Sequence, residues 1–219
     1  HNVYNLMWSK SIWEGYQRHQ VQRRPFILSR SGTSGSQRYG VSMWSGDIGS
    51  NLASLNAQHN VQMHMSLSGI DYFGSDIGGF YRHAAQPGIT TEDLYTLWLA
   101  NASLLDVPLR PHTMNLDNRY ETAPSLIGDV DSNRANVRLR YELSPYLYSA
   151  AHRAYRSGEP LFAPLVYFFQ NDPQARTIGS QKMIGDSLMM VTITDNRGDD
   201  IPVYLPAGGW YNYYTQQYF

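Results

Sequence analysis

The stretch QRYGVSMWSGDIGS, residues 37–50, joins a short apolar run to a glycine-containing loop. Its part RYGVSMW predicts a strand, and the loop that follows carries Asp47. A lone aspartate in such a loop is usually a turn former whose carboxylate accepts hydrogen bonds from nearby backbone. Two neighbours favour a functional role instead. Trp44 offers a bulky apolar wall, and Arg38 offers a donor fork that fits paired hydroxyls or a carboxylate.

Helix-like and strand-like apolar patterns alternate around this stretch, up to residue 156. The order is helix, strand, strand, helix, strand, helix, strand, helix, which favours a parallel sheet covered by helices. About four strands make half of an eight-stranded β/α barrel, not a whole one. Thr90 with Asp93 fits a capping box, and Ser144 fits an N-cap ahead of Pro145. The expected helices cover 2–19, 51–67, a segment after Thr90 and 131–156. The expected strands are RRPFILSR, RYGVSMW, the first part of GIDYFGSDIGGF, which continues as a glycine-rich loop, and VPLRPH.

The pattern changes after Gly158. QKMIGDSLMMVTITD, DIPVYLPAGGW and WYNYYTQQYF are strand-like, lack a helical period and are joined by Gly, Pro, Asn and Asp turns. We therefore expect part of a barrel over residues 1–157 and the start of an antiparallel β domain over 158–219. The chain opens on HNVYNLMW, typical of a helix interior, and closes on strand-like sequence, so we expect it to be part of something longer.

The composition limits the class of partner. Hydrophobic residues make up 42% of the chain and charged residues 16%, which is typical of a globular protein. The net charge is −1 and no basic block occurs, so a nucleic acid or an anionic membrane has little electrostatic support as a partner. Without cysteine there are no disulfides and no thiolate metal sites, and the compartment stays undecided. The many aromatic rings fill a core by default, but they also suit stacking on sugar rings.

Two further segments place polar side chains just after expected strands. In GSDIGGF, residues 74–80, the plain interpretation is a tight turn whose glycines adopt positive φ, and the functional one puts Asp76 at a ligand with Phe80 as a wall. In RPHT, residues 110–113, His112 follows a strand and a proline. A solitary histidine is more often structural. However, the carboxyl-end loops of a β/α barrel meet at one mouth, so His112 can join Asp47 and Asp76 there.

Other site chemistries find little support. His59 and His64 are five residues apart, which is not the spacing that puts two metal ligands on one helix face. The sequence contains no G-x-S-x-G, no G-x-G-x-x-G and no Walker A motif. Hydrolysis through a serine elbow and nucleotide binding through a glycine-rich loop are therefore not indicated.

Four segments in order resemble glycoside hydrolase family 31, the α-glucosidases, α-xylosidases and related α-glucosyltransferases. They are RPFILSRSGTSGSQRYGVSMWSGDIGS, LSGIDYFGSDIGGF, VPLRPHT and LRYELSPYLYSAAHRAYRSGEPLFAPLVY. The resemblance covers nearly the whole chain, including VYLPAGGWYNYY. It implies the second half of a (β/α)8 TIM barrel, followed by the beginning of an antiparallel β-sandwich domain.

The resemblance also implies roles for single residues. Asp47 matches the general acid/base of the W-x-G-D motif, with Trp44 lining the pocket. The family usually has Arg-Asn-His where this chain has Arg-Pro-His, a departure that concerns substrate preference and not the class of reaction. The further substrate contacts that the resemblance implies are Arg38, Asp76, Phe80 and His112.

One part of the family's site is missing from the sequence. Retaining glycosidases use two carboxylates about 5–5.5 Å apart, and the family's nucleophile lies in a W-x-D-M-N-E-like segment that does not occur here. The resemblance thus implies an α-glucosidase-like chain that carries the acid/base and acts on terminal α-linked glucose of oligosaccharides. The nucleophile would come from the remainder of the barrel, in another chain or a longer parent. We expect the 219 residues alone to be inactive, and the mechanism requires no cofactor or metal.

Three alternatives remain open at this point. An α-glucosyltransferase of the same family would pass the sugar to another sugar. A non-catalytic sugar-binding fragment would also explain the absent nucleophile. An unrelated β/α-barrel enzyme would use Asp47 and Asp76 as its own pair.

Overall fold

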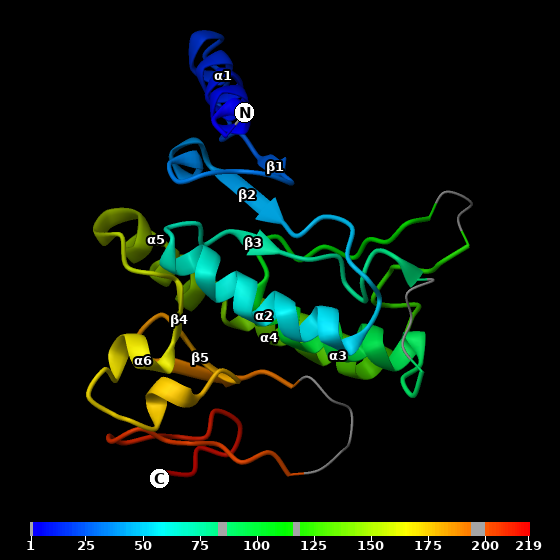
Figure 1. The fold of residues 1–219 in the computed structure, drawn as a ribbon, viewed down its shortest axis with the longest axis vertical. Coiled ribbons are helices and arrows are strands. Elements are labelled where there is room, and N and C mark those ends of the chain that lie inside the picture. Colours follow the sequence, from blue (N-terminus) through cyan, green and yellow to red (C-terminus); the bar gives the residue numbers. More distant parts are fainter. Residues whose placement is uncertain (1, 83–86, 116–118, 194–199) are drawn as a thin grey trace.

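The computed structural model describes residues 2–82, 87–115, 119–193 and 200–219 (Figure 1). Its first sheet contains β1 (Ile27–Ser29), β2 (Val41–Trp44) and β3 (Phe73–Gly74), side by side in chain order. Both pairings are parallel, with Ile27 opposite Val41 and Trp44 opposite Gly74. The parallel sheet predicted from the alternating pattern is confirmed. The carboxyl ends of all three strands therefore lie on the same side of the sheet.

Helices alternate with these strands. They are α1 (Tyr4–Arg18), α2 (Leu52–Leu67) after β2, and α3 (Thr91–Leu105) after β3. The side chain of Asn51 caps α2 by accepting from Ser54 N at 2.8 Å, and Thr90 Oγ1 caps α3 by accepting from Asp93 N at 3.0 Å. The Thr90 cap predicted from the sequence is thus present. The expected strand VPLRPH contributes only a parallel bridge between Arg110 and Asp76, because its two prolines supply no backbone donor.

The predicted helical region 131–156 is divided into α4 (Val130–Glu142) and α5 (Ser144–Ser157). The division at Leu143 follows from Pro145, which lacks a backbone N–H and crowds the carbonyl four residues before it. The predicted N-cap role of Ser144 is wrong. Ser144 is the first residue of α5, and its hydroxyl donates to Arg140 O at 3.0 Å. Helix α5 ends at Gly158, whose φ of 75° is the left-handed conformation that closes many helices.

The second sheet is antiparallel, with the order β4 (Phe162–Pro164), β5 (Gln181–Ile184) and β6 (Leu188–Val191). The short helices α6 (Leu165–Phe168) and η3 (Ala175–Thr177) connect β4 to β5. The segment QKMIGDSLMMVTITD, predicted to be strand-like, forms the two strands of the hairpin β5–β6, although its residues 194–195 lie outside the described residues. The strand expected in DIPVYLPAGGW does not form, and the end of the chain instead closes through an antiparallel bridge between Tyr211 and Tyr218.

Separate apolar clusters connect these layers. Figure 1 shows α2, α3 and α4 between the two sheets, with α1 and the C-terminus towards opposite ends of the long axis. One cluster fills the space between α2 and α3, and another joins β1, β2 and β3 to Ile12 of α1. A third packs the end of α3 and α5 against β4 and β5, so the second sheet shares a core with the first part of the chain. Over the described residues, no helix combines the length and apolarity needed to cross a membrane.

Candidate active site

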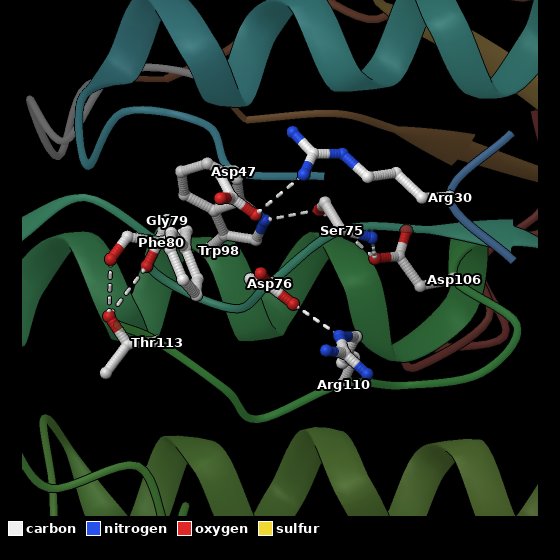
Figure 2. Close-up of polar contacts among 10 residues, drawn as sticks. All are labelled: Arg30, Asp47, Ser75, Asp76, Gly79, Phe80, Trp98, Asp106, Arg110 and Thr113. Carbon is white, nitrogen blue, oxygen red and sulfur yellow. Dashed lines mark hydrogen bonds and ion pairs between the residues drawn. The ribbon is translucent and has the colours of Figure 1, made fainter. Parts of the chain in front are cut away.

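Asp47 lies in the loop that leaves the carboxyl end of β2 (Figure 2). Its side chain is 29% exposed, and its Oδ1 lies 3.7 Å from Nη1 of Arg30, the residue that follows β1. The hydroxyl of Tyr81 donates to Asp47 Oδ2 at 3.4 Å. Since β1 and β2 are adjacent parallel strands, their carboxyl ends bring Arg30 and Asp47 together, and the carboxylate stays accessible from solvent.

Backbone hydrogen bonds join the loop that carries Asp47 to the loop after β3. Ile48 O accepts from the backbone N–H groups of Phe80 and Tyr81, each at 2.9 Å. Gly79, with a φ of +82°, crosses the first loop so closely that a Cβ there would lie 2.6 Å from Ser50 Cα. Only glycine fits such an approach at positive φ. The glycines of GSDIGGF therefore serve the packing of two loops that carry candidate residues.

Asp76 is fully buried, one residue beyond Ser75 at the end of β3. Its Oδ1 accepts from Arg110 Nε at 2.5 Å (Figure 2), while its Oδ2 has no hydrogen-bond partner within the described residues. Burial raises the pKa of Asp76, the bond and charge of Arg110 and the charge of His112 lower it, and the charge of Asp47 raises it. The loops that carry Asp47, Asp76 and His112 are joined by backbone hydrogen bonds, from Phe80 N to Ile48 O at 2.9 Å and from Ile77 N to Arg110 O at 3.0 Å.

Arg110 is a site residue that the sequence analysis did not single out. Its guanidinium carbon lies 4.8 Å from the centroid of the Trp44 ring, a cation–π geometry, while its Nε binds Asp76. The residue thus joins the predicted pocket wall to the predicted supporting carboxylate. One feature of the sequence could have pointed to Arg110. It lies two residues before His112, at the carboxyl end of an expected strand.

Phe80 and His112 form an aromatic wall beside these carboxylates. Their ring centroids are 5.8 Å apart at an interplanar angle of 37°, and His112 is exposed. Thr113 supports the wall, because its Oγ1 contacts the carbonyl oxygens of Gly79 at 3.2 Å and Phe80 at 2.9 Å (Figure 2). The structure therefore brings Phe80 and His112 together, as the sequence predicts.

Arg38 is the predicted site residue that the structure does not bring to Asp47. It lies exposed on the short helix η1 (Ser36–Tyr39), which precedes the amino end of β2, whereas Asp47 follows the carboxyl end. The position near Asp47 belongs to Arg30. Gly46 permits this contact, because a Cβ on Gly46 would lie 2.5 Å from Arg30 Nε.

The cluster offers an accessible carboxylate, cationic donors and aromatic walls, which suit proton transfer beside a hydroxyl-rich ring. Within the described residues, no group of three or more His, Cys, Asp or Glu side chains is placed to hold a metal ion.

Family models match both parts of the chain. The Glycosyl hydrolases family 31 TIM-barrel domain matches residues 1–150, and the Glycosyl hydrolase family 31 C-terminal domain matches 158–219. Neutral alpha-glucosidase C of Mus musculus is 32% identical over 225 residues, covering 100% of this chain and 24% of that protein. An alpha-xylosidase of Saccharolobus solfataricus is 32% identical over 215 residues, covering 98% of this chain and 29% of that protein. The chain thus spans about a quarter of the length of these relatives.

Solved structures show the same arrangement of the chain. A family 31 dextranase of Flavobacterium johnsoniae, complexed with glucose, has a TM-score of 0.86 and 26% identity, covering 100% of this chain and 27% of that one. A family 31 alpha-xylosidase of Xanthomonas citri has a TM-score of 0.82 and 29% identity, covering 95% of this chain and 23% of that one. Both parts of the fold lie within these matches.

Proposed function

The chain belongs to glycosyl hydrolase family 31, and we propose that it carries the acid/base half of a retaining α-glycosidase site. The proposed substrate is an oligosaccharide with a terminal α-linked glucose, since several relatives are α-glucosidases. The observation that carries the proposal is the partly exposed carboxylate of Asp47, at a strand's carboxyl end beside Arg30 and Tyr81. Asp47 protonates the glycosidic oxygen of the leaving group and later takes a proton from water.

Arg30 takes the substrate-binding role that the family resemblance suggested for Arg38. Its guanidinium is largely exposed and lies 3.7 Å from Asp47, so its remaining donors can reach hydroxyls of a sugar in the same place. Trp44, Phe80 and His112 supply flat walls for the ring.

Asp76 supports the site and is not the nucleophile. A nucleophile must reach the anomeric carbon, whereas Asp76 is 0% exposed and one of its oxygens is bound by Arg110. The second carboxylate of the retaining pair, about 5–5.5 Å from the first, is therefore supplied from outside these 219 residues. This division of roles also disfavours the use of Asp47 and Asp76 as a catalytic pair.

Residues 1–157 are proposed to form the second half of the (β/α)8 barrel, and 158–219 the start of the β-sandwich. In support, β1, β2 and β3 are parallel and adjacent in chain order, and the Asp76–Arg110 bridge sets a fourth segment beside β3. The antiparallel order β4-β5-β6 begins just after Gly158. Each βα unit then contributes its carboxyl-end loop to one mouth.

The proposed partner is the remainder of the barrel, in another chain or a longer parent. The strand β1 is at the edge of the described sheet, and an unpaired parallel edge is a liability in solution. Next to this edge, α1 leaves large apolar side chains more than half exposed. A complementary half-barrel would cover both features. The exposed side chains on α1 and its N-cap residue are Val3, Tyr4, Met7 and Trp8.

Reconstitution tests the proposal. The 219-residue chain is assayed on maltose alone and after co-expression with the first half of a family 31 barrel, and Asp47→Asn is compared with Asp131→Asn, a substitution at a side chain that is 90% exposed. We expect glucose release only from the combined halves, and a loss of at least about 100-fold for Asp47→Asn, typical of a general acid/base.

Each outcome bears on a stated part of the proposal. Turnover by the chain alone would show that the nucleophile lies within it, against the assigned roles. Full activity of Asp47→Asn would remove Asp47 from the chemistry and favour a sugar-binding fragment. Longer oligosaccharides formed at high maltose concentration would identify a glucosyltransferase that uses the same acid/base.

A further inference from the structure

Arg82 is a buried cation next to the candidate site, and the proposed reaction does not use it. It follows Tyr81 in the chain, and 6% of its surface is exposed. Its Nε donates to Thr113 Oγ1 at 3.2 Å, whereas its Nη1 and Nη2 are buried and have no hydrogen-bond partner within the described residues. Burial of a charged group is costly. The bond to Thr113 is therefore the contact that fixes the direction of this guanidinium in the described part of the chain.

The turn after β3 leaves room for the Arg82 guanidinium. Gly78 has a φ of +79°, and a Cβ there would lie 3.2 Å from Arg82 Nη1 and 3.3 Å from Tyr95 Cδ2. Glycine suits both the positive φ and the close approach. The turn that begins at Asp76 of the candidate site therefore packs directly against the guanidinium.

Thr113 connects Arg82 to the aromatic wall. Its Oγ1 accepts from Arg82 Nε and contacts the carbonyl oxygens of Gly79 at 3.2 Å and Phe80 at 2.9 Å (Figure 2). Met114 N also donates to Phe80 O, at 3.0 Å. A hydroxyl has one proton to donate, so a donor that occupies its lone pair directs that proton towards the carbonyl oxygens. Arg82 thus sets the orientation in which Thr113 holds the backbone of Phe80.

The segment next to Arg82 carries two residues of the candidate site. Phe80 belongs to the aromatic wall, and the hydroxyl of Tyr81 donates to Asp47 Oδ2 at 3.4 Å. The backbone N–H groups of Phe80 and Tyr81 both donate to Ile48 O, one residue beyond Asp47. A shift of this segment would therefore move the wall and the hydroxyl that contacts the acid at the same time.

We propose that Arg82 is a positioning residue for the candidate active site: through its bond to Thr113 it fixes Phe80 and Tyr81 relative to Asp47. The feature that this role requires is a donor at the Nε position of the side chain. The inference rests on the proposed function in treating Asp47 and Phe80 as parts of a sugar site. The effect on the backbone at residues 80–81 is independent of any reaction.

Two substitutions separate the bond from the rest of the side chain. Arg82→Gln places an amide nitrogen where arginine has Nε, so it keeps a donor for Thr113 and removes the charge. Arg82→Met places a methyl group at the same position and has no donor. Because glutamine and methionine are similar in length and volume, both variants lose the same guanidinium packing. Arg134→Met, at an exposed arginine of α4, is the surface control.

Hydrogen–deuterium exchange of the 219-residue chain, read by NMR at pH 7, measures the amides of Phe80 and Tyr81. Arg82→Met should lower their protection about tenfold relative to Arg82→Gln, which is the effect of losing one buried hydrogen bond. Arg82→Gln should keep the protection within about threefold of the wild type, and Arg134→Met should leave it unchanged. Equal protection in Arg82→Gln and Arg82→Met would overturn the inference, because charge or packing would then explain the whole effect.

Thr113→Val tests the other end of the bond, since it removes the hydroxyl and keeps Arg82. It should lower the protection of the same amides at least as much as Arg82→Met does. Addition of Arg82→Met to Thr113→Val should lower the protection no further, because both changes break one connection. Losses that add would contradict the proposed path through Thr113.

The comparison still holds if Arg82→Met exchanges freely in every segment. Arg82→Gln is then compared with Thr113→Val, which keeps the cation and lacks the bond. The inference requires protected amides at Phe80 and Tyr81 in Arg82→Gln and a loss of about tenfold or more in Thr113→Val. The same protection in both variants would overturn it.

The reconstituted barrel provides a second measurement. Arg82→Met should lower kcat/KM on maltose about tenfold relative to Arg82→Gln, with a raised KM because the aromatic wall moves. If the reconstituted barrel releases no glucose at all, the proposed function fails, and the exchange experiment still tests the inference. If it is active and Arg82→Gln and Arg82→Met have the same kcat and KM, the inference alone fails.

Discussion

Arg30 Nη1 lies 3.7 Å from Asp47 Oδ1, although the two residues are 17 positions apart in the chain. Arg38 is nearer in sequence, but it lies on η1 before the strand that leads to Asp47. The contact arises because β1 and β2 run parallel, so residues that follow each strand meet at one edge of the sheet. Under the proposed function, Arg30 is therefore the arginine placed to contact both the Asp47 carboxylate and the substrate.

Single replacements of Arg30 and of Arg38 by leucine in the reconstituted enzyme show which of the two arginines contacts the substrate. Arg30→Leu should lower kcat/KM on maltose by at least about 100-fold, because a charge-assisted contact near the reacting atoms is lost. Arg38→Leu, at an exposed position outside the cluster, should change kcat/KM by less than about threefold. Initial-rate kinetics measure both. A larger loss in Arg38→Leu would restore the role suggested by the family resemblance.

Arg110→Met should destabilise the chain by about 3 kcal/mol at pH 7, since it leaves the buried carboxylate of Asp76 without its cation. Urea unfolding measures the change. The pKa of Asp76 is already raised by burial, and loss of Arg110 raises it further, so native Asp76 holds its proton to higher pH than the unfolded chain does. The deficit should therefore shrink as the pH falls from 7 towards 4. A double variant with Asp76→Asn should recover part of the loss, and no recovery would contradict the assigned pairing.

Gly79→Ala should destabilise the chain by about 3 kcal/mol, because a Cβ would clash with the Ser50 backbone at 2.6 Å. Gly88→Ala is the matched control. Its φ of +91° is equally unfavourable for alanine, but a Cβ there meets nothing within 4 Å, so only the conformational cost of about 1–2 kcal/mol remains. Thermal unfolding compares the variants. Equal losses at both positions would show that loop contact does not restrict Gly79.

His59→Gln should make the chain less sensitive to acid. Burial lowers the pKa of His59 to about 3, so between pH 6.5 and pH 3 the unfolded chain binds a proton that the native chain does not. In the wild type this group lowers the free energy of unfolding by about 1.4 kcal/mol for each pH unit in that window. Urea midpoints across the pH range measure the slope, with His64→Gln, an exposed position on the same helix, as the control. An unchanged slope in His59→Gln would mean that the imidazole is protonated in the native chain.

The sequence is a reliable guide wherever structure depends on neighbours along the chain. The alternation of periods predicts the parallel sheet and its helices, the Thr90 cap depends on residues three apart, and the β5–β6 hairpin on one short segment. Positions just after strands indicated Asp47, Asp76, Phe80 and His112, which do lie in one region. The sequence analysis did not predict that α4 and α5 are separate helices, or that residues 200–210 form no strand. Both segments contain proline, which has no backbone N–H to donate, and the local apolar pattern does not show this effect.

Contacts between distant segments needed the folded chain. Arg30 rather than Arg38 meets Asp47, Arg110 reaches both Asp76 and Trp44, and Lys182 binds His59 across 123 residues. A local sequence pattern does not predict these contacts. They depend on which strands have their carboxyl ends side by side and on how the second sheet packs against α2. Residue types and spacing set the elements and the candidate acids, while the register of the strands and the shared core set the partners of each charge.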